Sequence, residues 1–183
     1  MLLSVEEYLR FCKKSPDANV ERTAEGEVVV VPLPGGEASF RETEVDGPLW
    51  VWARAHGRGR ALNASVQFLL PSGAALSPDA AWVSKERLAT LTRKQRTEFL
   101  RVVPEFVVEV MSPSDRLRNA QRKMQTWMAN GVQLGWLIHG DERTVYVYRQ
   151  NADVEARQHV NEIAGEGAVA GFLLELTELW EGL

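Results

Sequence analysis

The segment Phe106–Met111 (FVVEVM) constrains the fold of this chain more than any other, because five of its six side chains are apolar and the sixth is Glu109. A strand that is apolar on both faces is typical of the centre of a sheet that other layers cover on both sides. An ionised carboxylate buried there without a partner costs several kcal/mol. The sequence therefore predicts that Glu109 binds a metal ion, a cation or a shared proton. A structural pair with an arginine is the alternative.

The segments around this strand predict a mixed sheet. Residues 115–130 predict a helix that ends at Asn130-Gly131, a typical C-cap signal, and Leu134–His139 predicts the next strand. The unit 106–139 should therefore be a right-handed parallel crossover. Further expected helices are at 4–13, at 40–56 (broken or late-starting because of Gly47-Pro48), within 85–101, and at the end of the chain, 173–183. Further expected strands are at 27–31, 62–70, 79–84 and 144–149. This order favours an α/β fold class (α+β mixed sheet), with a central mixed β-sheet flanked by helices.

The length of 183 residues favours one domain over 1–183, with a core at about 20–150 and with the helix at 4–13 and the tail at 160–183 as extensions. Cys12 is the one cysteine, which excludes an internal disulfide and favours a cytoplasmic location. No apolar run reaches the ~18 residues of a membrane span, and the N-terminal residues predict an amphipathic helix instead of a signal peptide. Because no Cys or His pairs have metal-ligand spacing, oxygen ligands and hence magnesium, manganese or calcium are favoured.

The charge of the chain is unevenly distributed. The net charge is −4, but residues 85–123 hold ten Lys and Arg against five Asp and Glu, which makes this segment +5. Residues 1–84 carry −3 and residues 124–183 carry −6. A basic segment in an acidic protein is compatible with contact to a nucleic acid, and solvated helix faces are the alternative explanation.

Two further residues extend the candidate site. Asp79 follows Pro78 at the start of a predicted strand, thirty residues before Glu109, and two carboxylates that converge at a strand end can hold a divalent cation. Lys123 lies on the helix that follows Glu109, so its ammonium could point back at the carboxylates, and a solvated helix lysine is the alternative. Together the three residues predict metal-dependent hydrolysis of a phosphodiester bond.

These segments also resemble a known family. The relevant runs are Ser77–Val83 (SPDAAWV), Phe106–Asp115 (FVVEVMSPSD), Lys123–Gln125 (KMQ), Asn130–Val132 (NGV) and Leu134–Ile138 (LGWLI), together with the Gly165–Gly167 and Gly171-Phe172 positions of the tail. In this order and spacing the chain resembles the Uma family of restriction-endonuclease-like proteins, in the PD-(D/E)xK nuclease superfamily, from about residue 4 to residue 180.

The resemblance implies a restriction-endonuclease-like fold and roles for individual residues. Asp79 and Glu109 match metal ligands that would bind Mg²⁺ or Mn²⁺. The superfamily's lysine would stand at position 111, which is Met111 here, and Lys123 matches the members in which this lysine has moved to the next helix. An additional N-terminal acid often assists in such nucleases. Glu42 is the first choice for that role and Glu21 is the second.

The predicted function is hydrolysis of DNA by a metal-dependent endonuclease, with DNA as partner, no membrane, and a homodimer or higher homo-oligomer suited to double-strand cutting. The main alternative is a catalytically inactive nuclease-like module that binds nucleic acid or protein, which the acidic net charge and the absent lysine at position 111 both allow. A third possibility is an unrelated carboxylate–metal hydrolase that acts on small phosphates.

Overall fold

The computed structural model describes residues 1–183 and is built around a six-stranded sheet in the order β10-β9-β8-β7-β6-β3. The strands are β3 (Gly59–Asn63), β6 (Ala80–Ser84), β7 (Phe106–Val110), β8 (Leu134–His139), β9 (Thr144–Arg149) and β10 (Glu155–Gln158). β7 lies near the centre, antiparallel to β6 and parallel to β8, whereas the other pairings are antiparallel. The predicted mixed sheet and the parallel pairing around residues 106–139 are therefore confirmed.

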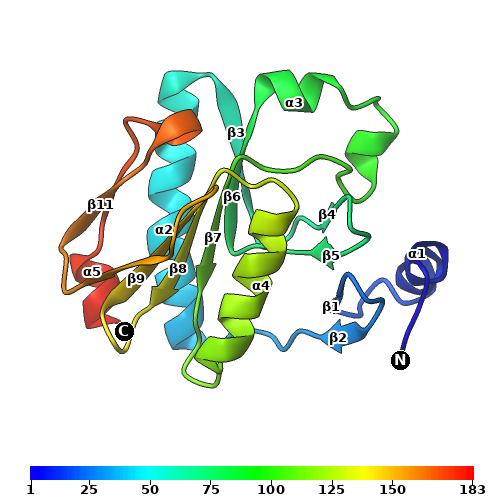
Figure 1. The fold of residues 1–183 in the computed structure, drawn as a ribbon, viewed down its shortest axis with the longest axis horizontal. Helices are drawn as coiled ribbons and strands as arrows, with labels where there is room; N and C mark the ends of the chain where they lie inside the picture. The colour runs from blue at the N-terminus through cyan, green and yellow to red at the C-terminus, as the bar shows by residue number, and fades with distance from the viewer.

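Helices cover both faces of this sheet (Figure 1). α2 (Gly36–His56) packs on the face that presents Val108, and α4 (Leu117–Ala129) packs on the face that presents Val107. Because side chains alternate along a strand, Glu109 lies on the α4 side of the sheet. The carboxylate that the sequence singled out is thus enclosed between β7 and the helix that follows it.

Smaller elements surround the central layers. A second sheet has the order β2-β1-β5-β4 and lies beside α1, and a third pairs β11 with β12 beside α5. Their bounds are β1 (Val20–Arg22), β2 (Val28–Val30), β4 (Phe68–Leu69), β5 (Ala75–Leu76), β11 (Glu162–Ala164), β12 (Leu173–Glu175), α1 (Val5–Lys14), α3 (Lys85–Ala89) and α5 (Thr177–Glu181), with 3₁₀ turns at Gln95–Thr97 and Gly167–Val169. None of the helices combines the length and apolar character that crossing a membrane requires.

The expected break in the second helix is wrong, because α2 runs through Pro48 without interruption. Pro48 cannot donate to the carbonyl of Glu44. It lies on the exposed side of the helix, where water can satisfy that carbonyl. Val45 and Leu49 of the same helix are buried against the sheet, and packing of this kind supplies most of a helix's stability in a protein.

Two other expected elements have different boundaries. The predicted strand at 62–70 is divided into β3 and β4 by a turn in which Asn63 accepts the backbone N–H of Ser65 through its side chain and that of Val66 through its carbonyl. The predicted helix at 173–183 begins with a strand instead, because Leu174 pairs with Ile163 and is fully buried. In the first place a local turn interrupts the apolar pattern, and in the second strand pairing overrides it.

Candidate active site

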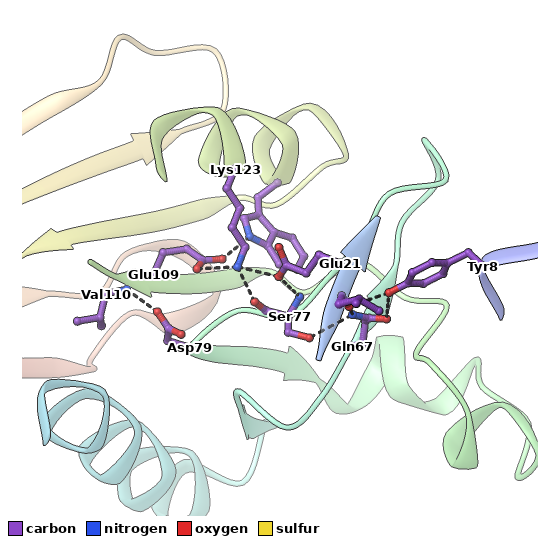
Figure 2. Close-up of polar contacts among 10 residues, drawn as sticks. Tyr8, Glu21, Gln67, Ser77, Asp79, Glu109, Val110 and Lys123 are labelled. Atoms are coloured by element: carbon purple, nitrogen blue, oxygen red, sulfur yellow. Dashed lines mark hydrogen bonds and ion pairs between the residues drawn. The ribbon is translucent and has the colours of Figure 1, made fainter. Parts of the chain in front are cut away.

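The candidate site is centred on the ammonium group of Lys123, which α4 extends toward the sheet (Figure 2). Its Nζ lies 3.0 Å from Glu109 Oε2 and 2.9 Å from Glu21 Oε1. It also donates to the backbone carbonyl of Ser77 at 2.7 Å. An ammonium has three N–H donors, so all three have partners within the protein. Lys123 is therefore a fixed, partly buried cation and not a solvated helix lysine.

Glu109 is held from two sides by the same helix. Its side chain is buried, with Oε2 on Lys123 and with Oε1 accepting a hydrogen bond of 2.8 Å from Trp127 Nε1. Lys123 and Trp127 are four residues apart on α4, so both face the same side of the helix. β7 thus supplies the carboxylate, and α4, which follows it after a short connection, supplies both of its donors.

Glu21 enters the site from the second sheet. It lies on β1, which pairs with β5 through Arg22 and Ala75. Ser77 follows β5, and its backbone N–H donates to Glu21 Oε1 at 2.9 Å while its carbonyl accepts from Lys123. The second-choice acid is therefore in direct contact with the lysine.

Asp79 lies where the chain passes from Ser77 into β6, at the same end of the sheet as Glu109 (Figure 2). Its backbone N–H donates to the carbonyl of Val108 at 3.1 Å, and its Oδ2 accepts from the backbone N–H of Val110 at 2.6 Å. The partners in these two bonds, Val108 and Val110, are the neighbours of Glu109 in β7, so Asp79 is held next to Glu109. Asp79 forms no ion pair with Lys123, so this carboxylate is positioned but not neutralised by contact.

Glu42, the first-choice acid, approaches from α2. It is half-buried and forms no hydrogen bond or ion pair, so Lys123 does not hold it as it holds Glu21. Burial and, to a smaller extent, the charge of Asp79 raise the pKa of Glu42 to about 7, although Lys123 lowers it. Glu42 is therefore electrostatically part of the site, beside Asp79, although it lacks a direct partner.

The pKa values within the site reflect burial first and the charges of neighbouring groups second. Burial raises the pKa of Glu109 to about 8 and that of Asp79 to about 6, with Lys123 lowering both and Glu21 raising both. Burial alone would lower the pKa of Lys123, but Glu109, Glu21 and Asp79 more than offset this effect, so its pKa lies above the ordinary value. The lysine stays protonated while the carboxylates compete for too little positive charge.

This imbalance is the basis for asking whether the residues fit a divalent cation. Four carboxylates, Glu21, Glu42, Asp79 and Glu109, share one amine, and Asp79 and Glu42 have no cation in contact. No three acidic, histidine or cysteine side chains form a closed metal-binding cluster. An Mg²⁺ site does not require one, because this ion keeps several waters and uses one or two carboxylates together with substrate phosphate. The excess of carboxylate oxygens over cations therefore fits a hard divalent cation.

The basic segment predicted near the site is divided between the two ends of the sheet. β6 starts beside Asp79 and ends at Ser84, so α3 lies at the end remote from the site (Figure 1). Arg116, Arg118 and Arg122 instead belong to the first turns of α4, next to the end of β7 that carries Glu109. All three are exposed and form no ion pair. Only this second group of cations adjoins the site.

Two contributors were missed by reasoning from the sequence. Trp127 was not among the predicted site residues, although its spacing of four residues from Lys123 signals that the two share a helix face. Gln67 donates to the carbonyl of Val20 at 2.9 Å and thereby ties β4 to the residue before Glu21, while its carbonyl oxygen accepts from the Tyr8 hydroxyl at 2.8 Å. No local pattern marks Gln67, because its role depends on the packing of two distant segments.

The chain is similar to a known protein family and to solved structures. A family model described as "Uma2: Putative restriction endonuclease" matches residues 5–177. A crystal structure of "a putative nuclease belonging to DUF820" from Anabaena variabilis is similar with a TM-score of 0.81 and 21% identity, covering 98% of each chain. A DrdV–DNA complex is similar with a TM-score of 0.39 and 16% identity, covering 84% of this chain and 81% of that one. No curated protein matches. Because the family model spans most of the chain, this protein belongs to the Uma2 family of restriction-endonuclease-like proteins.

Proposed function

We propose that this protein is an endonuclease that hydrolyses DNA phosphodiester bonds with the help of Mg²⁺ or Mn²⁺. The observation that carries the proposal is the convergence of Asp79, Glu109 and Lys123, from three separate elements, at one end of the sheet. Asp79 and Glu109 would hold the cation, and Glu42 and Glu21 are the additional acids. When bound, a divalent cation polarises the phosphate and lowers the pKa of the attacking water.

The protein's own groups have distinct tasks in this proposal. The Val110 N–H orients Asp79 and the Trp127 N–H orients Glu109, so each carboxylate has one fixed donor. Lys123 remains protonated and therefore acts as a fixed positive charge beside the scissile phosphate instead of as a base. Arg118 and Arg122, exposed on α4 next to the site, would contact the DNA backbone.

The test is a plasmid-nicking assay with Mg²⁺ or Mn²⁺. Asp79→Asn and Glu109→Gln should each lower the cleavage rate at least about a hundredfold, because each removes an anionic ligand of the cation. Asp153→Asn changes an exposed carboxylate that forms no ion pair and should keep full activity. Activity that persists in both site variants would refute the assignment, and a parallel assay on RNA would define the nucleic acid.

A second candidate is a nuclease-like module that binds DNA without cutting it. It is favoured by Met111, which stands where the superfamily has its lysine, and by the saturation of the Lys123 donors. It predicts retention of DNA on a gel with no cleavage under any divalent cation.

We also propose that the protein acts in the cytoplasm and as a homodimer, since two copies of one site suit the cutting of two strands.

A further inference from the structure

The outward side of α2 exposes large apolar side chains among polar and small residues. Its inward side buries Val45 and Leu49 in the core. The opposite side presents Trp50, 50% exposed, and Val51, 59% exposed, and half-buried Phe40 belongs to none of the apolar clusters of the interior. An indole half exposed to water loses the free energy that its burial would contribute.

The residues on this side follow the spacing of a helix-pairing seam. Positions 40, 43, 47, 50 and 54 are separated by alternating steps of three and four, which is the period at which one helix packs against another. Gly47 lies in the middle of the seam, exposed, and a Cβ built there would meet nothing within 4 Å. A second helix could therefore approach the backbone of α2 closely at this point.

Two charged residues flank Trp50 at equal distances along the helix. Asp46 lies four residues before it and Arg54 four residues after it, and neither forms an ion pair within the chain. Burial raises the pKa of Asp46, which is half-buried without a cation. The Arg54 guanidinium contacts only the Trp50 ring, 4.8 Å from its centroid. Neither the Asp46 carboxylate nor the Arg54 guanidinium therefore has an ion-pair partner of opposite charge.

This arrangement is self-complementary. If two α2 helices cross antiparallel with a two-fold axis at Trp50, Asp46 of one copy faces Arg54 of the other, and the reverse pair forms by symmetry. The two indoles meet at the axis, where aromatic anchors contribute most to an interface. A parallel or shifted pairing would set like charges against each other or leave both unpaired.

We infer that the outward side of α2, from Phe40 to Arg54, is the surface through which two copies of this chain form a dimer. The inference gives the homodimer proposed above a specific interface. It does not depend on cleavage, because its test measures mass. Failure of this interface and failure of the nuclease assignment are therefore distinguishable.

The experiment is sedimentation of the full chain over a range of concentrations. The wild type should have twice the chain mass, and Trp50→Ala should raise the dissociation constant about thirtyfold or more. Arg54→Glu and Asp46→Arg should each shift the protein toward monomer, because each sets like charges against each other at two symmetric contacts. Circular dichroism melts of these exposed-site variants would show that the fold is intact.

The charge swap makes the test decisive. The double variant Asp46→Arg/Arg54→Glu should dimerise again, and an equimolar mixture of the two single variants should form a heterodimer, since two cations of one copy then face two anions of the other. A monomeric wild type would overturn the inference. So would a dimer that survives both Trp50→Ala and Arg54→Glu, or single variants that fail to pair when mixed.

Discussion

Two glutamates four residues apart, at opposite ends of β7, have different surroundings. Glu105 and Glu109 are equally buried, 5% and 7% exposed. Glu105 pairs with Arg87 Nε at 3.0 Å and accepts the backbone N–H of Ser84 at 3.1 Å, so one carboxylate has one cation. Glu109 must share Lys123 with Glu21 and with the nearby Asp79.

The comparison shows that burial of a carboxylate does not by itself mark a functional site. Glu105 is the structural pair with an arginine that the sequence left open as the alternative for Glu109. At Glu109 the negative charges outnumber the positive ones, and this excess, which Glu105 lacks, supports the proposed cation. The distinction can be tested by making the same Glu→Gln substitution at position 105 and at position 109.

The largest expected difference is in catalysis. Glu109→Gln should lower the rate of DNA cleavage at least about a hundredfold, since it removes a cation ligand, whereas Glu105→Gln should retain the wild-type rate at a temperature where it stays folded. Initial rates on supercoiled plasmid measure both. Equal rates in the two variants would remove the functional distinction between the two ends of β7.

The next effect is on stability. Lys123→Met leaves several acids around an apolar side chain and should lower the free energy of unfolding by about 3 kcal/mol at neutral pH. Arg87→Met leaves only Glu105, which keeps the Ser84 N–H, so a smaller loss of about 2 kcal/mol is expected. Urea denaturation gives both values. A Lys123→Met variant as stable as the wild type would show that Lys123 does not offset the charges of the buried carboxylates around it.

The pH dependence of stability should separate the two ends further. The folded-state pKa values of Glu109 and Asp79 are raised to about 8 and about 6, so the folded protein holds protons that the unfolded chain releases. The stability that these protons contribute is fully present below the pKa values of the unfolded chain, which are near 4. It is lost as pH rises through the folded-state pKa values of about 6 and about 8. Without metal, the melting temperature should therefore fall across this range, and Glu109→Gln should flatten the fall. A melting temperature that rises with pH would contradict the raised pKa values of Glu109 and Asp79.

The smallest effect is expected at Trp127. Trp127→Phe keeps the buried ring but removes the N–H that donates to Glu109 Oε1, which should cost about 1 kcal/mol. Because that hydrogen bond lowers the pKa of Glu109, its loss should raise this pKa further. Carboxyl titration followed by NMR would detect the change, and an unchanged pKa would mean that the bond is not formed in solution.

Parts of this structure were predictable from local patterns. β7 is apolar on both faces, and α4 ends at Asn130, so the strand–helix–strand unit follows from the sequence. β1 has only three residues, and it exists because β2 and β5 pair with it. Its three-residue pattern carries no signal of its own, so the contact of Glu21 with Lys123 could not be predicted from the sequence.

The same limit applies within the site. Asp79, Glu109 and Lys123 could be proposed from motif and spacing. Ser77 acts through its own backbone and Gln67 through a side-chain bond to a backbone carbonyl, and both roles depend on where two sheets meet. The continuity of α2 through Pro48 was likewise decided by packing on the sheet. Local sequence specifies each element, but the contacts between distant segments complete the site.

The central claim, that Asp79 and Glu109 together bind a divalent cation, is tested most directly by calorimetric titration with Mn²⁺ at pH 6, 7 and 8. The affinity of the wild type should increase with pH, with release of protons, because both carboxylates must ionise to bind the cation. Asp79→Asn should abolish the binding and Glu105→Gln should leave it unchanged. A wild type that binds no Mn²⁺, or an Asp79→Asn variant that binds it as tightly as the wild type, would contradict the account.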